Sequence, residues 1–266
     1  MKAPVMKALI KIGGSLLDDP TSRADISRQI AAVAATGVLV TVVHGGGKQM
    51  TRFLEERGIQ SSFVRGLRVT TDETVDAVLK VLAGTVNTQL VAALGKAGVR
   101  AVGLTGIDAG VATAVQLDPE LGFVGKIVSS DPGLLETLSA AKYVPVIACV
   151  AGGGPAGDDA GTVYNVNGDS MAVAVASGWK VDRLVFLTDV PGVMNAERQI
   201  LPVLTVADCR RLIADGVATG GMQAKLNAAC DAVNSGVGEV RIVRGSDADI
   251  VAKVFAGEPV GTGVIA

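Results

Sequence analysis

Short apolar segments rich in β-branched residues alternate with longer amphipathic segments along most of this sequence. Most of the short segments are apolar at every position, which is typical of strands that are covered on both faces. Strands that alternate with helices in this way favour a mostly parallel sheet with helices on both of its faces. We therefore predict an α/β fold whose strands lie at residues 8–12, 39–43, 101–104, 144–150, 184–187 and 240–243.

The segments between these strands carry helical periodicity and helix-start signals. Residues 74–94 place apolar side chains on one stripe at every third or fourth position, which predicts a long amphipathic helix. Thr205 with Asp208, and Ser246 with Asp249, have the spacing of capping boxes that open later helices.

The middle of the chain has a different pattern. Residues 111–129 alternate between apolar and polar side chains around a Pro-Glu pair, which predicts a β-hairpin inserted at the rim of the fold. Residues 150–164 are a glycine-rich loop rather than a linker. We therefore predict one domain with two lobes, divided near Ser177, where a new strand–loop–helix series begins.

Composition argues against several classes of function. The 266 residues are 49% hydrophobic, which is enough for a large buried core. A net charge of −2 and an aromatic content of 3% argue against nucleic acid as a partner. One histidine and three cysteines occur without metal-ligand spacing, so we expect no protein-held metal and no disulfide framework. Without a signal peptide or an apolar run of ~20 residues, we expect a cytoplasmic protein that has no membrane partner.

Two glycine-rich turns follow predicted strands, KIGGS at residues 11–15 and HGGGK at residues 44–48. Neither turn has dinucleotide-binding spacing, and Lys48 is followed by Gln49 where a P-loop requires Ser or Thr. Bare backbone N–H groups at the start of a helix bind oxyanions. The turns alone leave a structural role and a phosphate-binding role open.

Two lysines bear on the choice between a structural role and a phosphate-binding role for these turns. Lys11 lies within an apolar strand, and a buried ammonium is costly unless it is paired. It either reaches solvent at the end of the strand or faces an anion at the strand tips. Lys225 follows the glycine pair 220–221 at the start of a helix, where it is either solvated or placed for phosphate contact.

Further polar residues gather near other helix starts. Asn165, Asn167 and Asp169 alternate just before a very apolar helix, and a single N-cap accounts for only one of them. Arg68 precedes the long predicted helix, where its planar fork suits a carboxylate unless it is simply solvated.

These motifs and their order resemble the amino-acid kinase superfamily and, within it, the acetylglutamate kinases. The resemblance extends over essentially residues 7–266, and GLRVT and NVN-x-D are its most specific parts. The matching motifs are KIGG from Lys11, HGGG from His44, GLRVT from Gly66, NVNGD from Asn165, TDVPG from Thr188, GGMQAK from Gly220 and GTG from Gly261.

The resemblance implies one three-layer αβα sandwich spanning residues 1–266. Its N-terminal lobe, about residues 1–177, would bind an acyl amino acid, and its C-terminal lobe, about residues 178–266, would bind ATP. It also implies a homodimer whose central sheet runs through both subunits.

Carried over residue by residue, the resemblance implies three sets of functional residues. Lys11 and Lys225 would stabilise the moving phosphoryl group, and Asp169 would hold both lysines in place. The acyl amino acid would contact Gly46, Gly47, Asn165 and Arg68, the last through its α-carboxylate. ATP would be bordered by Gly13, Gly14, Asp189, Val190, Pro191, Gly192, Val193, Met194, Val217, Ala218 and Thr219.

The implied reaction moves the γ-phosphoryl group of ATP to the side-chain carboxylate of N-acetylglutamate, with Mg²⁺ carried mainly by the nucleotide. A carboxylate with a pKa of ~4.3 is already ionised at neutral pH, so no general base is needed. One methylene separates this substrate from acetylaminoadipate or a carrier-linked aminoadipate, which leaves a lysine-pathway kinase as an alternative. A dehydrogenase would need a G-x-G-x-x-G fingerprint, which the sequence lacks. A catalytically inactive sensor with the same fold would be expected to lack Lys11, Asp169 or Lys225, and all three are present.

The chain departs from the family pattern at three points. Gly168 stands where many relatives have alanine, which we expect to weaken a helix slightly without touching the chemistry. Ile107 replaces a lysine that is common in relatives, so we expect that lysine's contacts to be lost. The sequence starts ten residues before Lys11, without the extra helix that joins dimers of arginine-inhibited relatives into hexamers. We therefore expect an arginine-insensitive dimer.

Overall fold

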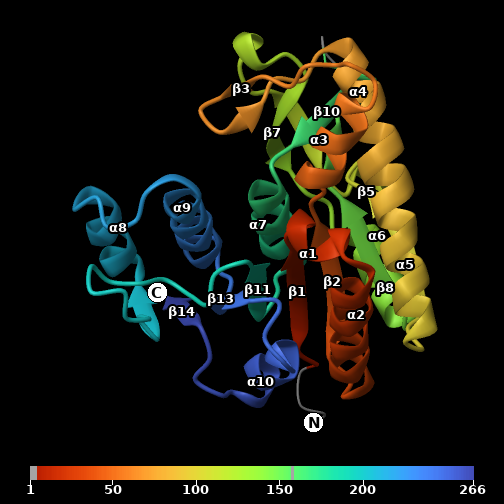
Figure 1. Cartoon of the computed structure of the whole chain (residues 1–266). Coiled ribbons are helices and arrows are strands. Elements are labelled where there is room, and N and C mark those ends of the chain that lie inside the picture. The colour runs from red at the N-terminus through yellow and green to blue at the C-terminus, as the bar shows by residue number, and fades with distance from the viewer. Residues whose placement is uncertain (1–4, 157–158) are drawn as a thin grey trace.

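The central sheet of the protein has eight strands and is almost entirely parallel. The structure is a computed structural model that describes residues 5–156 and 159–266 (Figure 1). Among the described residues, every pair of neighbouring strands in this sheet is parallel except the last two strands along the chain. In spatial order the strands are β12 (Val203–Thr205), β14 (Thr262–Ile265), β13 (Glu239–Arg244), β11 (Arg183–Thr188), β1 (Lys7–Ile12), β2 (Leu39–His44), β8 (Val144–Ala148) and β5 (Ala101–Thr105).

Helices cover both faces of this sheet and bury a separate hydrophobic cluster on each. On one face lie α1 (Gly14–Asp18), α2 (Pro20–Ala35), α3 (Gly47–Glu55), the long helix of residues 72–96, and α10 (Ile250–Ala256). On the other lie α6 (Gly133–Ala140), α7 (Gly168–Trp179), α8 (Val206–Ala214) and α9 (Gly220–Asn234).

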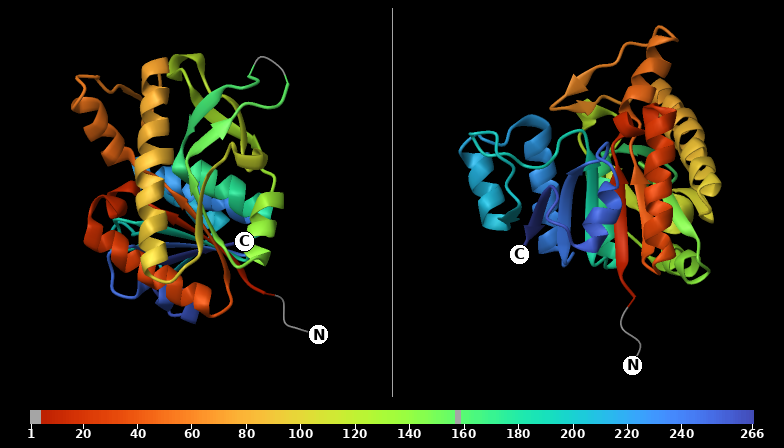
Figure 2. Two further views of the ribbon diagram at one scale, coloured as in Figure 1. Left: turned by 90° about the vertical axis from the view of Figure 1, so that its right-hand side faces the viewer. Right: turned by 60° about the horizontal axis from the view of Figure 1, so that its bottom comes forward.

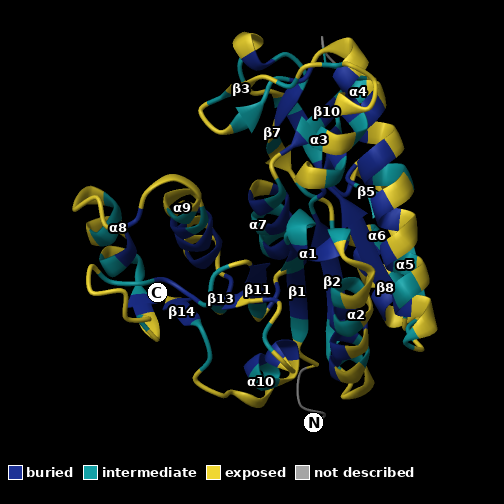
Figure 3. Ribbon diagram, viewed as in Figure 1, coloured by how far each residue is buried: buried dark blue, intermediate teal, exposed yellow. Residues whose placement is uncertain are grey.

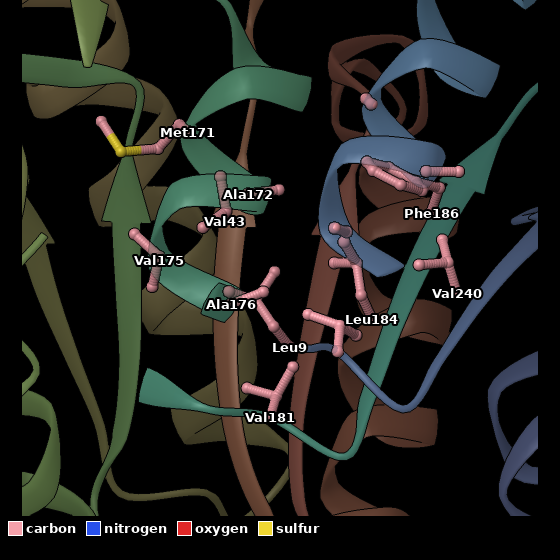
Figure 4. Close-up of a cluster of buried hydrophobic side chains, with 14 of the residues drawn as sticks. Leu9, Val43, Met171, Ala172, Val175, Ala176, Val181, Leu184, Phe186 and Val240 are labelled. Atoms are coloured by element: carbon pink, nitrogen blue, oxygen red, sulfur yellow. The ribbon is translucent and has the colours of Figure 1, made fainter. Parts of the chain in front are cut away.

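Successive strand residues alternate between the two clusters, so that Leu9 packs on one side and Ile10 on the other. Figure 4 shows Leu9 and Val43 facing Ala172, Val175 and other side chains of α7. The strands of the central sheet are accordingly buried, while the outer helix faces are exposed (Figure 3). The predicted three-layer αβα sandwich is confirmed.

One predicted strand is wrong in its extent. Residues 144–150 were expected to form a single strand, but β8 ends at Ala148 and a second strand, β9 (Val150–Gly152), begins two residues later. The chain leaves the central sheet at Cys149 because β9 pairs instead with β10 (Val163–Val166) in a small four-stranded barrel. The predicted hairpin supplies the other two strands, β6 (Thr113–Gln116) and β7 (Val124–Ser129), with a 3-10 turn at Pro119–Leu121 between them.

The long helix consists of α4 (Asp72–Val78), a π-helical segment η1 (Leu79–Val86) and α5 (Asn87–Lys96), seen end to end in Figure 2. Its 25 residues are long and apolar enough to cross a membrane by length and composition alone. The helix instead buries Val78, Leu82 and Leu90 against the rest of the protein, as a core helix does.

The helix-start signals had mixed outcomes. Thr205 forms the expected reciprocal capping box with Asp208 at the start of α8. Asp249 precedes α10 with a left-handed backbone and no side-chain cap, so the second predicted capping box is wrong.

A short hairpin, β3 (Phe63–Val64) with β4 (Leu67–Arg68), lies at one end of the molecule (Figure 1).

Candidate active site

Lys11 and Lys225 meet at a single carboxylate. Lys11 comes from β1, Asp169 from the first turn of α7, and Lys225 from α9, and α7 and α9 pack side by side (Figure 1). The Lys11 Nζ lies 2.6 Å from Asp169 Oδ1, and the Lys225 Nζ lies 3.4 Å from Asp169 Oδ2. The sequence placed these two lysines far apart, and the structure brings them into one cluster.

The electrostatics of this cluster favour the charged carboxylate. Only 11% of the Asp169 side chain is exposed, and burial on its own would raise the pKa of Asp169. The neighbouring ammonium groups of Lys11 and Lys225 outweigh burial and hold that pKa below its ordinary value. The cluster therefore carries two ammonium groups against one carboxylate, a net positive charge at the strand tips.

The two glycine turns pack backbone against backbone beside this cluster. A Cβ on Gly14 would lie 2.8 Å from the Gly46 nitrogen and 2.9 Å from the Gly47 nitrogen. The N–H groups of Gly14, Gly46 and Gly47 have no hydrogen-bond acceptor within the described chain, whereas the N–H of Gly13 donates to the Leu187 carbonyl. The turns thus place three free donors close together, which suits an oxyanion.

Only part of the glycine pattern is explained by room for a ligand. A Cβ on Gly47 would meet nothing within 4 Å, so that face is open. A Cβ on Gly46 would overlap the Leu82 side chain, and one on Gly14 would strike the backbone of the other turn. The resemblance implies that Gly46 and Gly47 contact the acyl amino acid, but Gly14 and Gly46 also lack a Cβ because packing within the protein leaves no room for one.

All four predicted acyl-amino-acid contacts line one cavity of about 190 Å³, formed around Gly46, Gly47, Arg68 and Asn165. Arg68 is held in place by hydrogen bonds to the Thr51 hydroxyl at 2.7 Å, to the Ser61 hydroxyl and to the Gly47 carbonyl at 3.4 Å.

Partial burial lowers the pKa of Arg68, and the Glu55 carboxylate opposes that shift. The Asn165 amide donates to the Thr70 hydroxyl at 3.0 Å. A fixed guanidinium and an amide at the same cavity can recognise a carboxylate and its neighbouring polar groups.

Nine of the predicted nucleotide-binding residues lie in two loops in the last third of the chain, whereas Gly13 and Gly14 lie in the turn after β1. Asp189, Val190, Pro191, Gly192, Val193 and Met194 follow β11, and the buried Val193 N–H donates to the Thr262 hydroxyl at 2.8 Å. Val217, Ala218 and Thr219 join α8 to α9. Thr219 precedes α9 without a side-chain cap, so the first N–H groups of this 15-residue helix remain open to an anion.

A second cavity, of about 500 Å³, adjoins the first and was not anticipated. It lies between α7 and α9 beside β7, shares Leu67, Val124 and Asn167 with the smaller cavity, and reaches Asp169. Of the charged cluster, Asp169 therefore borders this second cavity. No local sequence signal marks this cavity, because it arises only where distant helices meet.

The structure shows the surroundings of two departures from the family pattern, Gly168 and Ile107. A methyl group on Gly168 would lie 3.2 Å from Lys11 Cε and 3.3 Å from Cys149 Sγ, so this position touches the Lys11 side chain rather than only the helix. Ile107 is 41% exposed and lines neither cavity. Burial raises the pKa of the Cys149 thiol to about 12, and the thiol donates to the His44 carbonyl at 2.9 Å.

Known proteins resemble this chain over most of its length, in sequence and in fold. The sequence model of the amino acid kinase family matches residues 6–244. A curated acetylglutamate kinase from Solibacter usitatus is 56% identical over 260 residues, which cover 98% of this chain and 99% of the relative. A crystal structure from Streptococcus mutans UA159 superimposes with a TM-score of 0.83 at 27% identity, covering 98% of both chains. Carbamate kinase from Giardia lamblia shares the fold, with a TM-score of 0.73 at 16% identity and 98% of both chains covered.

Proposed function

The chain belongs to the amino acid kinase family, and from this we infer that it transfers the γ-phosphoryl group of ATP to the side-chain carboxylate of N-acetyl-L-glutamate, in arginine biosynthesis. The product is N-acetyl-L-glutamyl 5-phosphate. The observation that carries this inference is the convergence of Lys11 and Lys225 on Asp169 beside a cavity lined by Arg68 and free glycine N–H groups.

The mechanism needs charge stabilisation rather than proton transfer. Both the attacking carboxylate and the phosphoryl donor are anions, so the barrier is largely electrostatic and positional. Lys11 and Lys225 are compact point charges that can follow the phosphoryl group as it moves. Asp169 keeps their ammonium groups together without neutralising both, and the free N–H groups of the glycine turns add further stabilisation.

The smaller cavity supplies the acceptor site in this proposal. Arg68 binds the α-carboxylate of the acyl amino acid, and Asn165 binds its amino-acid portion. Gly46 and Gly47 lie against the reacting end, where their N–H groups are free. The position of the cavity within residues 1–177 supports the assignment of the acyl-amino-acid site to the N-terminal lobe.

The nucleotide is assigned to the C-terminal lobe, residues 178–266. The loop from Asp189 to Met194 and the segment Val217, Ala218 and Thr219 border it, and the open N-terminus of α9 suits its phosphates. Gly14 offers a free N–H from the N-terminal lobe, whereas the Gly13 N–H already donates to the Leu187 carbonyl. Mg²⁺ accompanies the ATP phosphates, because the Asp169 carboxylate is already shared by two lysines.

A hydroxylamine trap tests the reaction. An acyl phosphate reacts with hydroxylamine to give a hydroxamate, so the protein is incubated with MgATP and, in parallel, N-acetylglutamate, N-acetylaminoadipate or free glutamate. We expect hydroxamate with N-acetylglutamate, the substrate named for the relative from Solibacter usitatus. Preference for N-acetylaminoadipate would favour the lysine-pathway alternative, and a signal with free glutamate alone would contradict the acetyl-amino-acid assignment.

We also propose a cytoplasmic homodimer. β5 forms one edge of the central sheet, and joining two such edges would run the sheet through both subunits. The described cysteines are all free and buried, as expected in a reducing compartment. Sedimentation equilibrium should give twice the monomer mass, and a hexamer would contradict the proposal.

A further inference from the structure

A buried polar pair, His44 and Asn87, lies directly beneath the second glycine turn and has no part in the chemistry described above. The side chain of His44 is completely buried, and Asn87 is 4% exposed. The His44 Nδ1 lies 2.9 Å from the Gly45 carbonyl oxygen, and the His44 Nε2 lies 3.0 Å from the Asn87 Nδ2. Buried polar groups of this kind are expensive unless every partner is satisfied, so the arrangement is specific.

The hydrogen-bond partners fix which imidazole nitrogen carries the proton. The Asn87 Nδ2 also donates to the Val146 carbonyl at 2.9 Å, so the amide presents N–H to the ring and the His44 Nε2 must accept. The Gly45 carbonyl can only accept, so the His44 Nδ1 must donate. Asn87 therefore selects the neutral tautomer that can bind the Gly45 carbonyl.

This bond sets the direction of one of the free donors. In a trans peptide the C=O and the following N–H point in opposite directions. Because the Gly45 carbonyl is turned toward the imidazole, the Gly46 N–H is turned away from it, and Gly46 lines the acyl-amino-acid cavity. We propose that His44 and Asn87 are positioning residues for phosphoryl transfer, which hold the Gly45–Gly46 peptide so that the Gly46 N–H faces the transferred group.

The π-helical segment explains how Asn87 reaches this place. The Asn87 backbone N–H is shared between the Gly84 carbonyl and the Leu82 carbonyl, three and five residues earlier. The π winding brings residues five apart close to the same side of the helix. Leu82 covers Gly46, where a Cβ would overlap it, while Asn87 reaches the neighbouring His44. On the other side Gly103 makes room, because a Cβ there would overlap the Asn87 amide oxygen. One irregular helix thus braces the turn by both packing and hydrogen bonding.

Two substitutions at one position separate positioning from burial. In His44→Asn the amide nitrogen can occupy the place of Nδ1 and donate to the Gly45 carbonyl, at the expense of the contact with Asn87. In His44→Gln the amide can occupy the place of Nε2 and keep the contact with Asn87, but the Gly45 carbonyl loses its donor. Glutamine is the closer match to histidine in volume, so a purely structural role predicts that His44→Gln is the milder change.

The test measures kcat, the KM values for ATP and N-acetylglutamate, and the Tm of each variant, and it rests on the proposed function. We expect kcat to fall about 10²-fold in His44→Gln, as for loss of an oxyanion donor, with both KM values changed less than threefold. We expect the kcat of His44→Asn to be at least tenfold higher than the kcat of His44→Gln, even if the Tm of His44→Asn is lower. Asn87→Ala, which removes the tautomer selection, should resemble His44→Gln in kcat.

Each outcome has a separate meaning. Equal kcat losses in His44→Asn and His44→Gln, or losses that follow Tm alone, would overturn the positioning role while leaving the kinase assignment intact. If His44→Gln does not fold, the kcat values of His44→Asn and Asn87→Ala are compared instead. A higher kcat in Asn87→Ala than in His44→Asn would overturn the positioning role. Failure of the wild-type protein to form hydroxamate from N-acetylglutamate would instead overturn the proposed function.

Discussion

At the scale of single residues, the proposed chemistry depends on how one carboxylate holds two ammonium groups. Asp169 contacts both Lys11 and Lys225, whose side chains are 12% and 22% exposed, so each lysine loses hydration that the Asp169 carboxylate helps to replace. Breaking such a partly buried cluster leaves uncompensated charge, which is strongly destabilising. The arrangement leaves one positive charge in excess, and this excess is what a migrating phosphoryl group can use.

Replacing Lys225 with alanine should lower turnover rather than binding. Removal of one charge that acts on the transition state should reduce kcat by about 10²–10³, by analogy with the loss of an oxyanion donor. Steady-state kinetics with both substrates at saturation measures this effect. Near-normal kcat together with a raised KM for ATP would show that Lys225 binds the nucleotide without stabilising the transition state. Lys96→Ala, at the exposed end of α5 and away from both cavities, serves as a charge-matched control.

Replacing Arg68 with lysine should chiefly weaken acceptor binding. Lysine keeps the charge but loses the fork that hydrogen-bonds Thr51, Ser61 and a substrate carboxylate together. A charge-assisted hydrogen bond is worth about 1.5–3 kcal/mol, so the KM for N-acetylglutamate should rise about 10- to 100-fold. The KM for ATP provides the internal control and should change little. An unchanged KM for the acyl amino acid would remove Arg68 from the acceptor site.

At the scale of structural elements, the decisive contact is between two turns that are far apart in sequence. The turn after β1 and the turn after β2 belong to adjacent parallel strands, which brings their glycines together at one end of the sheet. Their contact brings three N–H groups without an acceptor in the described chain close together, and Leu82 of the π-helical segment packs against Gly46 beside them. Neither turn could present this donor cluster alone.

The pair Gly14→Ala and Gly47→Ala tests the contact between these turns. A Cβ on Gly14 would lie 2.8 Å from the backbone of Gly46, so Gly14→Ala should force the turns apart and lower the free energy of unfolding by about 1–3 kcal/mol.

Gly47→Ala has open space for its methyl group and should leave the stability within about 0.5 kcal/mol of wild type. Urea unfolding of both variants measures the difference, and equal stabilities would contradict the contact as described. Because the methyl group in Gly47→Ala projects where a ligand would approach, its kinetic parameters should change although its stability does not.

At the scale of the whole molecule, the single histidine gives folding stability a distinctive dependence on pH. Burial lowers the pKa of His44 to about 4, against the smaller opposing effect of its hydrogen bond to Gly45, whereas the unfolded chain titrates near 6.5. Below pH 6.5 the unfolded chain binds a proton that the folded protein does not, so stability falls as the pH falls toward about 4.

The size of this effect can be measured without interference from most carboxylates. Between pH 6.5 and 5, the free energy of unfolding should fall by about 1.6 kcal/mol, because the slope rises toward 1.36 kcal/mol per pH unit as the unfolded histidine becomes fully protonated. Urea unfolding at several pH values measures it, and His44→Asn, which carries no titrating group at this position, should flatten the slope. A wild-type stability that is constant over this range would show that His44 is not buried in its neutral form.

Much of the molecule follows from sequence pattern alone. Apolar strands that alternate with amphipathic helices predicted the parallel sheet and its two helical layers. This was possible because the spacing of apolar residues within each segment shows which of its faces is buried. The same order placed Lys11, Gly46 and Asp169 at strand ends or helix starts, where open α/β sheets bind ligands. Their places at strand ends and helix starts could therefore be predicted before any coordinates, although Gly46 and Asp169 line different cavities.

Tertiary structure alone decided what no single segment records. The strand predicted at residues 144–150 breaks at Cys149 because Val150 finds its partners in the barrel, more than ten residues further along the chain. Gly46 has no room for a Cβ because Leu82 packs against it, and Asn87 hydrogen-bonds the His44 ring. Leu82 and Asn87 belong to one long helix, and the amphipathic pattern of the sequence does not reveal its π-helical segment. Local sequence encodes which side of a segment is buried, whereas which atoms meet there depends on the packing of segments that are distant along the chain.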